Sequence, residues 1–399
     1  MKILMISDLP PCTNHTGGLF LDRLCTYLQE DNCQIFAYIV KNPEVGVEIP
    51  EDTKSSIDFV FDVKPRENIG REYNAFLSFV YDVFITYTEV RRIRKRIERH
   101  IKKIKPDMIW GVVQGQTMTK LIRRVATDCQ IEYSVQFYDP ISWWFQANKV
   151  DKLTQMKVMK EYGRMISDSY CFIGASDIMA EDYKALYGCK KSVGIMMPFD
   201  KGDSCSKKIK RDDKTFVIAI SGQLYARSTI LAFLYALSLM NWEYEEKKII
   251  FRIYGPEISF YGIKNAHIEY RGWIEQEQLL KELNEADLLY CPYRFDEGFR
   301  EVATYSFPGK LSTYMKTGVP IMVHSPEYSS IVRFVKEYQS AYVLETVDPS
   351  VIVAELKKII VDNNYDEMVY RANKTANDVL SDEITKKKIE YAMGIIDSI

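Results

Sequence analysis

Short apolar runs alternate with amphipathic helical patterns along most of the chain. The run at Lys2–Ser7 (KILMIS) ends at Asp8 and fits a buried parallel strand, because strands covered on both faces are apolar throughout. Helical spacing follows at Leu19–Gln29. The same alternation predicts further strands at 34–40, 56–63, 108–113, 131–137, 169–174 and 192–197, and helices at 73–105, 117–127, 153–166 and 177–187.

A polar stretch, Asp200–Lys214, interrupts this alternation and is the predicted linker. Beyond it we expect strands at 215–221, 248–254, 267–270, 287–293, 320–323 and 341–344, and helices at 229–240, 276–283, 306–317, 328–335, 351–361 and 383–396. Alternation on both sides of one break predicts two doubly wound α/β domains with parallel sheets, at 1–199 and 200–380. Ligands are then expected at the carboxyl ends of strands, in a cleft between the domains.

Composition narrows the functional class. The 399 residues include 53 Lys and Arg against 55 Asp and Glu, a net charge of −2, so we expect no nucleic-acid partner. Eight cysteines without a C-x-x-C pair and only four histidines predict no metal site and a reducing, cytoplasmic location. No signal peptide or membrane-spanning stretch is expected. The start of the chain also lacks the glycine pattern of a dinucleotide-binding site.

The segment Ala286–Val323 holds the most informative pattern. A strand leads into a loop rich in arginine and acidic residues, and a helix follows with Ser306 as the expected N-cap. Pro308 is tolerated in a first turn, Gly309 leaves room for a ligand, and Lys310 adds a positive charge there. Helix-start amides with a lysine favour a phosphate site. An ordinary strand–helix–strand unit with a surface lysine explains the pattern equally well.

This segment resembles the donor-binding element of GT-B fold glycosyltransferases, the family-4-like retaining group. The matching residues are Pro308, Lys310, Tyr314, Gly318 and Pro320. Weaker motifs follow in the family's order along nearly the whole chain: Pro10–Gly18, Lys105-Pro106-Asp107, Ser221–Leu224 with Arg227, and Arg252–Gly255. Two glutamates that are frequent in the group are replaced here by Tyr305 and Thr313, and the position of its N-domain histidine falls on Tyr138.

The resemblance implies a GT-B architecture and sugar transfer from a nucleotide sugar, most simply a UDP-sugar, without a bound metal or other cofactor. It places the acceptor on the first domain and the donor on the second, with the final segment 381–399 crossing back to the first. The catalytic candidates are Arg227, Lys310, Glu301 and Asp139. The donor-binding candidates are Gly222, Gln223, Tyr254, Gly255, Trp273, Glu297, Ser306, Pro308, Gly309 and Thr313.

Two further segments are candidates for acceptor binding. In Gln136–Asn148, Asp139 follows a strand, and the adjacent Trp143 and Trp144 cannot share one face, so an aromatic surface for a sugar is one interpretation. A loop packed under neighbouring helices is the other. The acceptor candidates are His15, Gly17, Gly18, Tyr138, Trp143 and Trp144. The glycines at the first helix are equally compatible with a plain turn.

The stretch Arg91–Lys105 contains nine arginines and lysines and a single acid, Glu98. Its isoleucines share one stripe, so the charges flank a buried seam. A solvated face is one interpretation, and docking to anionic lipid at the inner face of a membrane is the other. Membrane docking would suit an acceptor that is a glycan or a lipid-linked sugar in polysaccharide or glycoconjugate synthesis. Two other functions stay open: a nucleotide-sugar epimerase, and a non-catalytic homologue that binds nucleotide sugar or glycan.

Overall fold

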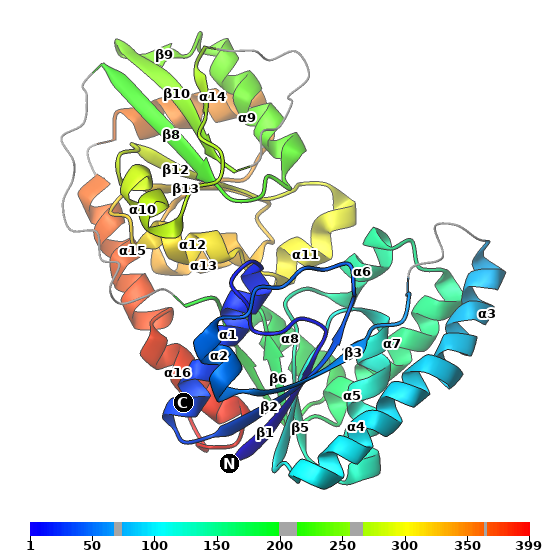
Figure 1. The fold of residues 1–399 in the computed structure, drawn as a ribbon. Helices are drawn as coiled ribbons and strands as arrows, with labels where there is room; N and C mark the ends of the chain where they lie inside the picture. Colours follow the sequence, from blue (N-terminus) through cyan, green and yellow to red (C-terminus); the bar gives the residue numbers. More distant parts are fainter. Residues whose placement is uncertain (68–73, 199–213, 256–265, 363–364) are drawn as a thin grey trace. The chain divides into compact units, whose positions relative to one another are not determined.

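The computed structural model describes residues 1–67, 74–198, 214–255, 266–362 and 365–399 (Figure 1). The chain divides into two compact units. Unit 1 comprises Met1–Met196 and Thr385–Ile399, and unit 2 comprises Met197–Ile384. Of the predicted linker Asp200–Lys214, all but Lys214 lies outside the described residues.

Unit 1 is built on a parallel sheet of strand order β3-β2-β1-β4-β5-β6-β7. Its strands are β1 (Lys2–Ser7), β2 (Gln34–Lys41), β3 (Asp58–Val63), β4 (Met108–Val112), β5 (Tyr133–Gln136), β6 (Cys171–Gly174) and β7 (Lys191–Gly194). Its helices are α1 (Thr16–Glu30), α2 (Glu51–Ser56), α3 (Ala75–Ile85), α4 (Arg91–Ile104), α5 (Gly115–Cys129), α6 (Ile141–Ala147), α7 (Lys152–Ser167), α8 (Asp177–Tyr187) and α16 (Asp382–Ala392). The strand order reverses between β1 and β4, where doubly wound sheets bind their ligands.

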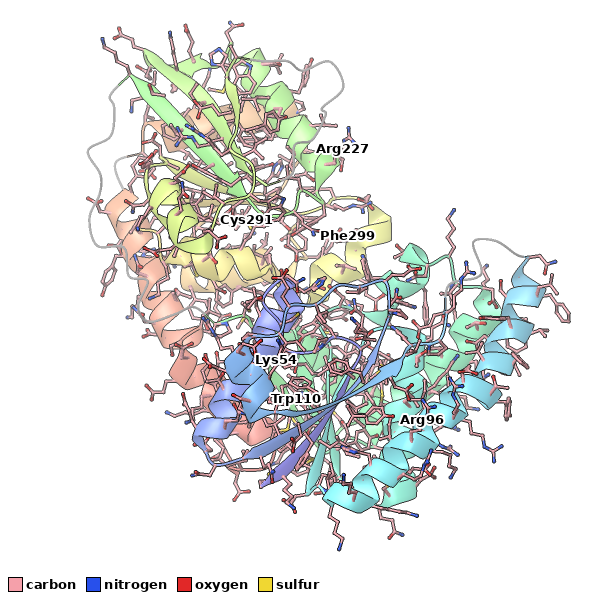
Figure 2. The ribbon with its side chains drawn as sticks, in the orientation of Figure 1. Lys54, Arg96, Trp110, Arg227, Cys291 and Phe299 are labelled. Carbon is pink, nitrogen blue, oxygen red and sulfur yellow. The ribbon has the colours of Figure 1, made fainter. Side chains whose placement is uncertain are left out.

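The centre of this sheet is fully buried. Trp110 of β4 has no exposed surface, and its indole Nε1 donates to Gln136 Oε1 at 3.1 Å (Figure 2). The chain end completes the unit, since Ser134 Oγ of β5 donates to the carbonyl of Ala392 in α16 at 2.6 Å. Lys388 Nζ of the same helix donates to the carbonyl of Gly194 at 2.8 Å. The last helix is therefore hydrogen-bonded to the edge and the middle of the unit 1 sheet.

The long helix predicted at 73–105 is present in three parts. Helix α3 is followed by a π-helical turn, η2 (Thr86–Val90), and then by α4, and the three form one rod along the side of unit 1 (Figure 1). The isoleucine stripe of α4 is buried as predicted, because Ile93, Ile97, Ile101 and Ile104 are at most 8% exposed. A π turn adds one residue to a helical turn, so the buried face changes register between α3 and α4.

Unit 2 contains a second sheet of order β11-β10-β8-β12-β13-β14, parallel except for β9, which pairs antiparallel with β10. Its strands are β8 (Thr215–Ser221), β9 (Glu243–Tyr244), β10 (Lys247–Tyr254), β11 (Ile268–Tyr270), β12 (Leu288–Pro292), β13 (Ile321–His324) and β14 (Tyr342–Leu344). Its helices are α9 (Arg227–Leu239), α10 (Gln276–Asn284), the 3-10 turn η4 (Glu297–Phe299), α11 (Arg300–Tyr305), α12 (Gly309–Met315), α13 (Ser330–Tyr338), α14 (Pro349–Ile360) and α15 (Tyr365–Val379). The prediction of two doubly wound parallel sheets is confirmed.

One predicted helix boundary near the candidate donor site is wrong. The helix expected at 306–317 begins only at Gly309, with Pro308 as its N-cap. Ser306 instead ends α11 with an extended backbone (φ −75°, ψ 153°). Proline disfavours a helical conformation in the residue before it, here Phe307, so the chain cannot enter the helix from Ser306.

Candidate functional site

Two glycines shape the carboxyl edge of the unit 2 sheet. Gly222 follows β8 with φ +81°, and its amide donates to the carbonyl of Tyr254 at 2.8 Å. Gly255 follows β10 with φ +155°, and a Cβ there would lie 2.6 Å from the carbonyl oxygen of Gly222. Neither position suits a side chain, so the two loops approach through bare backbone. A ligand can therefore reach main-chain groups at this edge.

Helix α12 places two side chains against the same edge. Lys310 Nζ donates to the carbonyl of Ser221 at 2.8 Å. The buried Tyr314 Oη accepts from the Ser221 amide at 2.8 Å and from Ser221 Oγ at 3.1 Å. The ammonium group of Lys310 also lies 3.9 Å from the place of a Cβ on Gly222. The predicted catalytic residue Lys310 is thus brought together with the predicted donor-binding residues Gly222 and Gly255.

The environment of Lys310 favours an anionic partner. Burial lowers the pKa of its ammonium group, with Cys291 acting in the opposite sense. Among the described residues, no carboxylate forms an ion pair with Lys310. Burying a cation costs free energy unless an opposite charge or several acceptors compensate it. A phosphate group at this edge would supply that charge.

An aromatic cluster that the sequence did not indicate adjoins Lys310. Its ammonium group lies 5.7 Å from the ring centroid of Tyr225, within cation–π range. Tyr225 packs edge-on against Tyr293 at 5.5 Å and lies 6.2 Å from Phe299, which is labelled in Figure 2. Thr229 Oγ1 of α9 donates to the Tyr293 carbonyl at 2.6 Å and holds this loop in place. Tyr225 lies three residues after Gly222, the only sequence signal that could have pointed to it.

The other predicted donor residues of the first loops are accessible to different degrees. Gln223 and Arg227 are exposed, and Arg227 is the first residue of α9. Tyr254 is buried at the end of β10, and its burial raises the pKa of its hydroxyl. Trp273 follows β11 and is 68% exposed, so its ring is free of protein cover for most of its area.

The acidic candidates lie on exposed turns. Glu297 in η4 pairs with Arg300 at 3.3 Å, and the Arg300 guanidinium covers the ring of Tyr328 at 4.1 Å. Glu301 is exposed in α11. The structure does not bring either glutamate into contact with Lys310.

The remaining predicted residues of the α12 segment differ in burial. Thr313 of α12 and Gly309 at its start are partly buried, whereas Pro308 is buried. Ser306 is buried before α12, and its carbonyl accepts from Ser330 Oγ of α13. The sequence predicted a phosphate site at a helix start capped by Ser306. Ser306 does not cap α12, so this part of the prediction is wrong. The segment contributes Lys310, which lies beside Gly222, to the candidate site.

In unit 1, four of the six predicted acceptor residues lie at the start of α1: His15, Gly17, Gly18 and Tyr138. The hydroxyl of Tyr138 donates to the Gly17 carbonyl at 3.4 Å, and a Cβ on Gly17 would lie 3.5 Å from the Tyr138 ring. Gly18 has no room for a side chain, since a Cβ would lie 2.2 Å from Cys12 Sγ. His15 is the N-cap of α1 with its Nε2 at 2.9 Å from the Gly46 carbonyl. The glycines are therefore explained by packing.

A shallow pocket is lined by Tyr138, Asp139, Trp143 and Trp144, together with the start of α5. Its volume of about 20 Å³ admits one water molecule or hydroxyl group rather than a sugar ring. Both tryptophans are half-buried, and Trp144 Nε1 is buried with no hydrogen-bond partner among the described residues. A sugar would have to lie over the tryptophans and direct one hydroxyl into the pocket.

A buried ionic network that the sequence did not indicate lies beside this pocket. Lys64 Nζ lies 2.8 Å from Asp8 Oδ2 and 3.1 Å from Glu67 Oε2. Burial opposes the charge of Lys64, but the two carboxylates raise the pKa of its ammonium group. Lys64 also lies 4.8 Å above the Trp144 ring. Asp8 and Lys64 each follow a parallel strand, β1 and β3, and that position was the signal available in the sequence.

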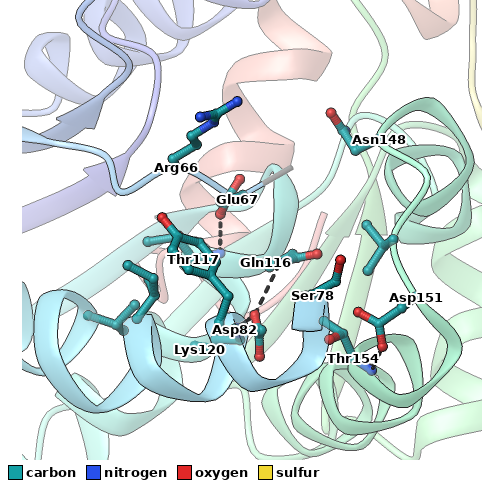
Figure 3. A pocket seen from close by; sticks show the side chains of 14 residues that line it. Arg66, Glu67, Ser78, Asp82, Gln116, Thr117, Lys120, Asn148, Asp151 and Thr154 are labelled. Atoms are coloured by element: carbon teal, nitrogen blue, oxygen red, sulfur yellow. Dashed lines mark hydrogen bonds and ion pairs between the residues drawn. The ribbon is translucent and has the colours of Figure 1, made fainter. Parts of the chain in front are cut away.

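Glu67 also satisfies the start of helix α5. Its carboxylate accepts a hydrogen bond from the Thr117 amide (Figure 3). A second cavity lies behind it, where Lys120 and Gln116 donate to Asp82 (Figure 3). That cavity also holds about 20 Å³, which suits water. The helix start that could have bound a ligand anion in unit 1 is thus occupied by a carboxylate of the chain itself.

Within the described ranges, His, Cys, Asp and Glu side chains form no group of three or more that could hold a metal ion.

Comparison with known proteins agrees with this architecture. Residues 234–392 match the sequence profile of the family described as "Glucosyltransferase 3-like, C-terminal domain". Glucosyltransferase 3 of Streptococcus gordonii is 26% identical over 138 residues, which is 34% of this chain. The matched stretch spans 38% of the length of that relative.

Solved structures match over almost the full chain. Sucrose-phosphate synthase of Thermosynechococcus elongatus superposes with a TM-score of 0.67 at 11% identity, covering 97% of both chains. Anabaena Alr3699/HepE, solved in complex with UDP-glucose, superposes with a TM-score of 0.64 at 11% identity, covering 99% of this chain and 100% of its own. The chain has the GT-B fold, so the fold implied by the resemblance drawn from the sequence is confirmed.

Proposed function

We propose that the protein is a glycosyltransferase that binds a nucleoside-diphosphate sugar on unit 2 and transfers its sugar to a glycan or lipid-linked acceptor. The observation that carries this proposal is the position of Lys310. Its ammonium group lies at the end of β8, beside the bare backbone of Gly222 and Gly255, without a carboxylate partner among the described residues. The match of residues 234–392 to a glucosyltransferase 3-like domain supports the same assignment.

The chemistry requires a cation at this point. Transfer breaks the bond between the anomeric carbon and the β-phosphate oxygen and forms a bond between the anomeric carbon and the acceptor oxygen. The electron pair of the broken bond goes to the departing diphosphate, which can take up the proton that the acceptor hydroxyl loses. A cation placed where this charge develops is worth about 10²–10³-fold in rate. Lys310 would supply it at the end of β8, and Arg227 at the start of α9 is a second candidate. This arrangement needs no bound metal ion.

The identity of the donor is part of the proposal. A relative named as a glucosyltransferase and a neighbour solved with UDP-glucose favour UDP-glucose. The exposed ring of Trp273 and the turn at Gly222 are candidates to hold the nucleotide. On unit 1, the pocket at Tyr138, Asp139 and Trp143 is the candidate acceptor site, because aromatic faces suit neutral sugar rings. A cytoplasmic location and a role in polysaccharide or glycoconjugate synthesis are further parts of this proposal.

Thermal unfolding with UDP, GDP, ADP, CMP and dTDP tests the donor site. A nucleotide at 100 times its Kd stabilises the native state by about 2.7 kcal/mol, or about 5–11 °C in Tm for a domain of this size. We expect one nucleotide to raise Tm in the wild type and not in Lys310→Met, which keeps the aliphatic stem. Lys281→Met, an exposed lysine of α10, is the matched control and should keep the shift.

Product assays with the nucleotide sugar then separate the alternatives. A transferase needs an acceptor, an epimerase converts the donor alone, and a binding homologue turns over nothing. A nucleotide shift that persists in Lys310→Met would contradict the donor-site assignment. The replacement of the family's glutamates by Tyr305 and Thr313 makes the binding homologue the alternative to compare.

A further inference from the structure

Helix α3 turns its apolar side chains outward. Phe76, Val80 and Phe84 are 68%, 46% and 60% exposed, and Tyr87 of the following π turn is 69% exposed. On the opposite face, Ser78, Asp82 and Thr86 are buried. This is the reverse of a helix on the surface of a water-soluble domain. A contiguous exposed apolar patch marks an interaction surface.

The exposed side chains of the rod change from apolar to basic at η2. Beyond this turn the exposed side chains of α4 are almost all basic. They are Arg91, Arg92, Lys95, Arg96, Arg99, Lys102 and Lys103, and Lys105 follows the helix. The whole chain carries a net charge of only −2, so this positive charge is concentrated on one element. Arg96, labelled in Figure 2, is paired with Asp62 of β3 at 2.9 Å. An apolar segment and a basic segment therefore follow one another on one exposed rod.

A cationic cavity lies where the two segments meet. It holds about 150 Å³, and its lining includes Tyr87, Arg91, Arg94, Lys120 and Arg124. Carboxylates outside the cavity lining pair with three of these cations. Arg94 lies 3.2 Å from Glu98 and 3.5 Å from Asp128. Arg124 lies 3.3 Å from Glu161, and Lys120 donates to Asp82. Guanidinium groups and a tyrosine hydroxyl are suited to bind phosphate oxygens.

We propose that this face docks on an anionic lipid bilayer. The side chains of α3 enter the bilayer interface, the cavity takes the phosphate of a lipid headgroup, and α4 rests on neighbouring anionic headgroups. Among the described residues, no helix is both long and apolar enough to cross a membrane, so the contact is with the surface. A second copy of this chain fits the charges less well, because an isologous contact would bring two basic α4 helices toward each other.

Co-sedimentation with vesicles tests the proposal. The purified full chain is mixed with phosphatidylcholine vesicles, or with vesicles in which about a third of the lipid is phosphatidylglycerol, at low and high salt. We expect binding to the anionic vesicles that weakens with salt. Phe76→Ser/Phe84→Ser should reduce partitioning about 10-fold or more. Arg91→Gln/Arg124→Gln should reduce it about 30-fold, about fivefold for each cation.

Matched controls come from unit 2. Tyr235→Ser/Leu239→Ser removes two side chains of α9 that are 56% and 52% exposed, and should leave binding unchanged. Lys281→Gln/Lys358→Gln removes two exposed cations and should also leave it unchanged. Tm and the nucleotide-induced shift in Tm, measured on every variant, show that folding and the donor site are intact.

Three results would overturn the proposal. The first is equal binding to both kinds of vesicle, and the second is binding to neither. The third is a dimer in solution that dissociates in Phe76→Ser/Phe84→Ser, because a second copy would then cover the face. None of these outcomes depends on the donor site, so they leave the proposed transfer reaction to be judged by its own tests.

Discussion

The two units differ in the charged groups that they place at the carboxyl ends of their parallel strands. In unit 2, Lys310 lies beside the end of β8 with backbone glycines around it and no ion pair within the described part of the chain. In unit 1, Lys64 lies between Asp8 and Glu67, and Glu67 also accepts from the first turn of α5. One edge leaves a cation uncompensated, whereas the other has an internal anion.

This difference separates the kinds of ligand that each edge can take. A helix start and a lysine that already hold a carboxylate offer little to a second anion. What remains free in unit 1 is the aromatic surface at Trp143, which suits a neutral sugar. In unit 2 an incoming phosphate would supply an opposite charge to Lys310, whose pKa is lowered by burial. Two sheets of the same architecture thus differ in the charges that the chain itself supplies at this edge.

The largest effect is expected for Lys310→Ala. Under the proposed function Lys310 faces the departing diphosphate, so its removal should lower transfer at least about 10²-fold. Steady-state kinetics with the donor identified from the nucleotide panel measures this, and Tm shows whether the fold survives the loss of the bond to Ser221. Near-normal turnover in a folded variant would remove the donor assignment and with it the comparison between the edges.

A smaller effect is expected in unit 1 for Glu67→Gln. The substitution removes one of two carboxylates around the buried Lys64 and weakens the cap of α5, which should cost about 2 kcal/mol or 4–8 °C in Tm. Glu355→Gln, which breaks an exposed pair with Lys358, is the matched control and should not change Tm. If Glu67→Gln is equally harmless, the internal anion does not stabilise this edge.

Substitutions of two tryptophans, Trp143 and Trp273, should distinguish acceptor binding from donor binding. Trp143→Ala is expected to raise the acceptor KM about 10-fold with the donor KM unchanged, since about 1.4 kcal/mol is typical of one aromatic contact. Trp273→Ala in unit 2 should do the reverse. Kinetics with each substrate varied in turn checks both. Unchanged acceptor kinetics in Trp143→Ala would leave the unit 1 pocket as plain packing.

The smallest effect is expected on the stability of the protein at acidic pH. His324 at the end of β13 is buried, its Nδ1 accepts from the Tyr290 hydroxyl, its Nε2 donates to the Thr346 carbonyl, and burial lowers its pKa to about 4. Between about pH 6.5 and 4 the unfolded chain binds a proton that the native state excludes. Stability is therefore complete above pH 6.5 and should fall by about 1 kcal/mol at pH 5.5.

Chemical denaturation between pH 7.5 and 5 checks this slope. His324→Gln should flatten this pH dependence even if the variant is less stable throughout. A wild-type slope that survives in His324→Gln would assign the acid sensitivity to other groups.

Much of the fold is readable in the sequence, because a parallel strand and an amphipathic helix each leave a clear period. Strands β1 and β8 and helix α8 have the predicted bounds. Helices α2, α6, α11 and α15 were not anticipated. Three of them have at most seven residues, too few for a helical period to show, and α15 is largely polar.

The site was predictable in part. Gly222, Gly255 and Lys310 carry a local signal, and the structure brings them together. In the Lys64 network, Lys64 and Glu67 are three positions apart. The contacts to Asp8 and Thr117 join residues 56 and 50 positions apart, which no local pattern contains. The exposed apolar face of α3 was also not predictable from the sequence. Buried residues are mostly apolar, but an apolar residue is not always buried, so the apolar pattern of α3 does not show which side faces outward.

The hydrogen bond between Ser134 and Ala392 joins residues 258 positions apart. During synthesis, the first 196 residues leave the ribosome long before the last 15, yet unit 1 needs both. The ribosome must therefore finish unit 2 before unit 1 can close, and contacts of such long sequence separation form slowly. A chain truncated before α16 should emerge with an incomplete first unit, recognised by chaperones or proteases as unfinished.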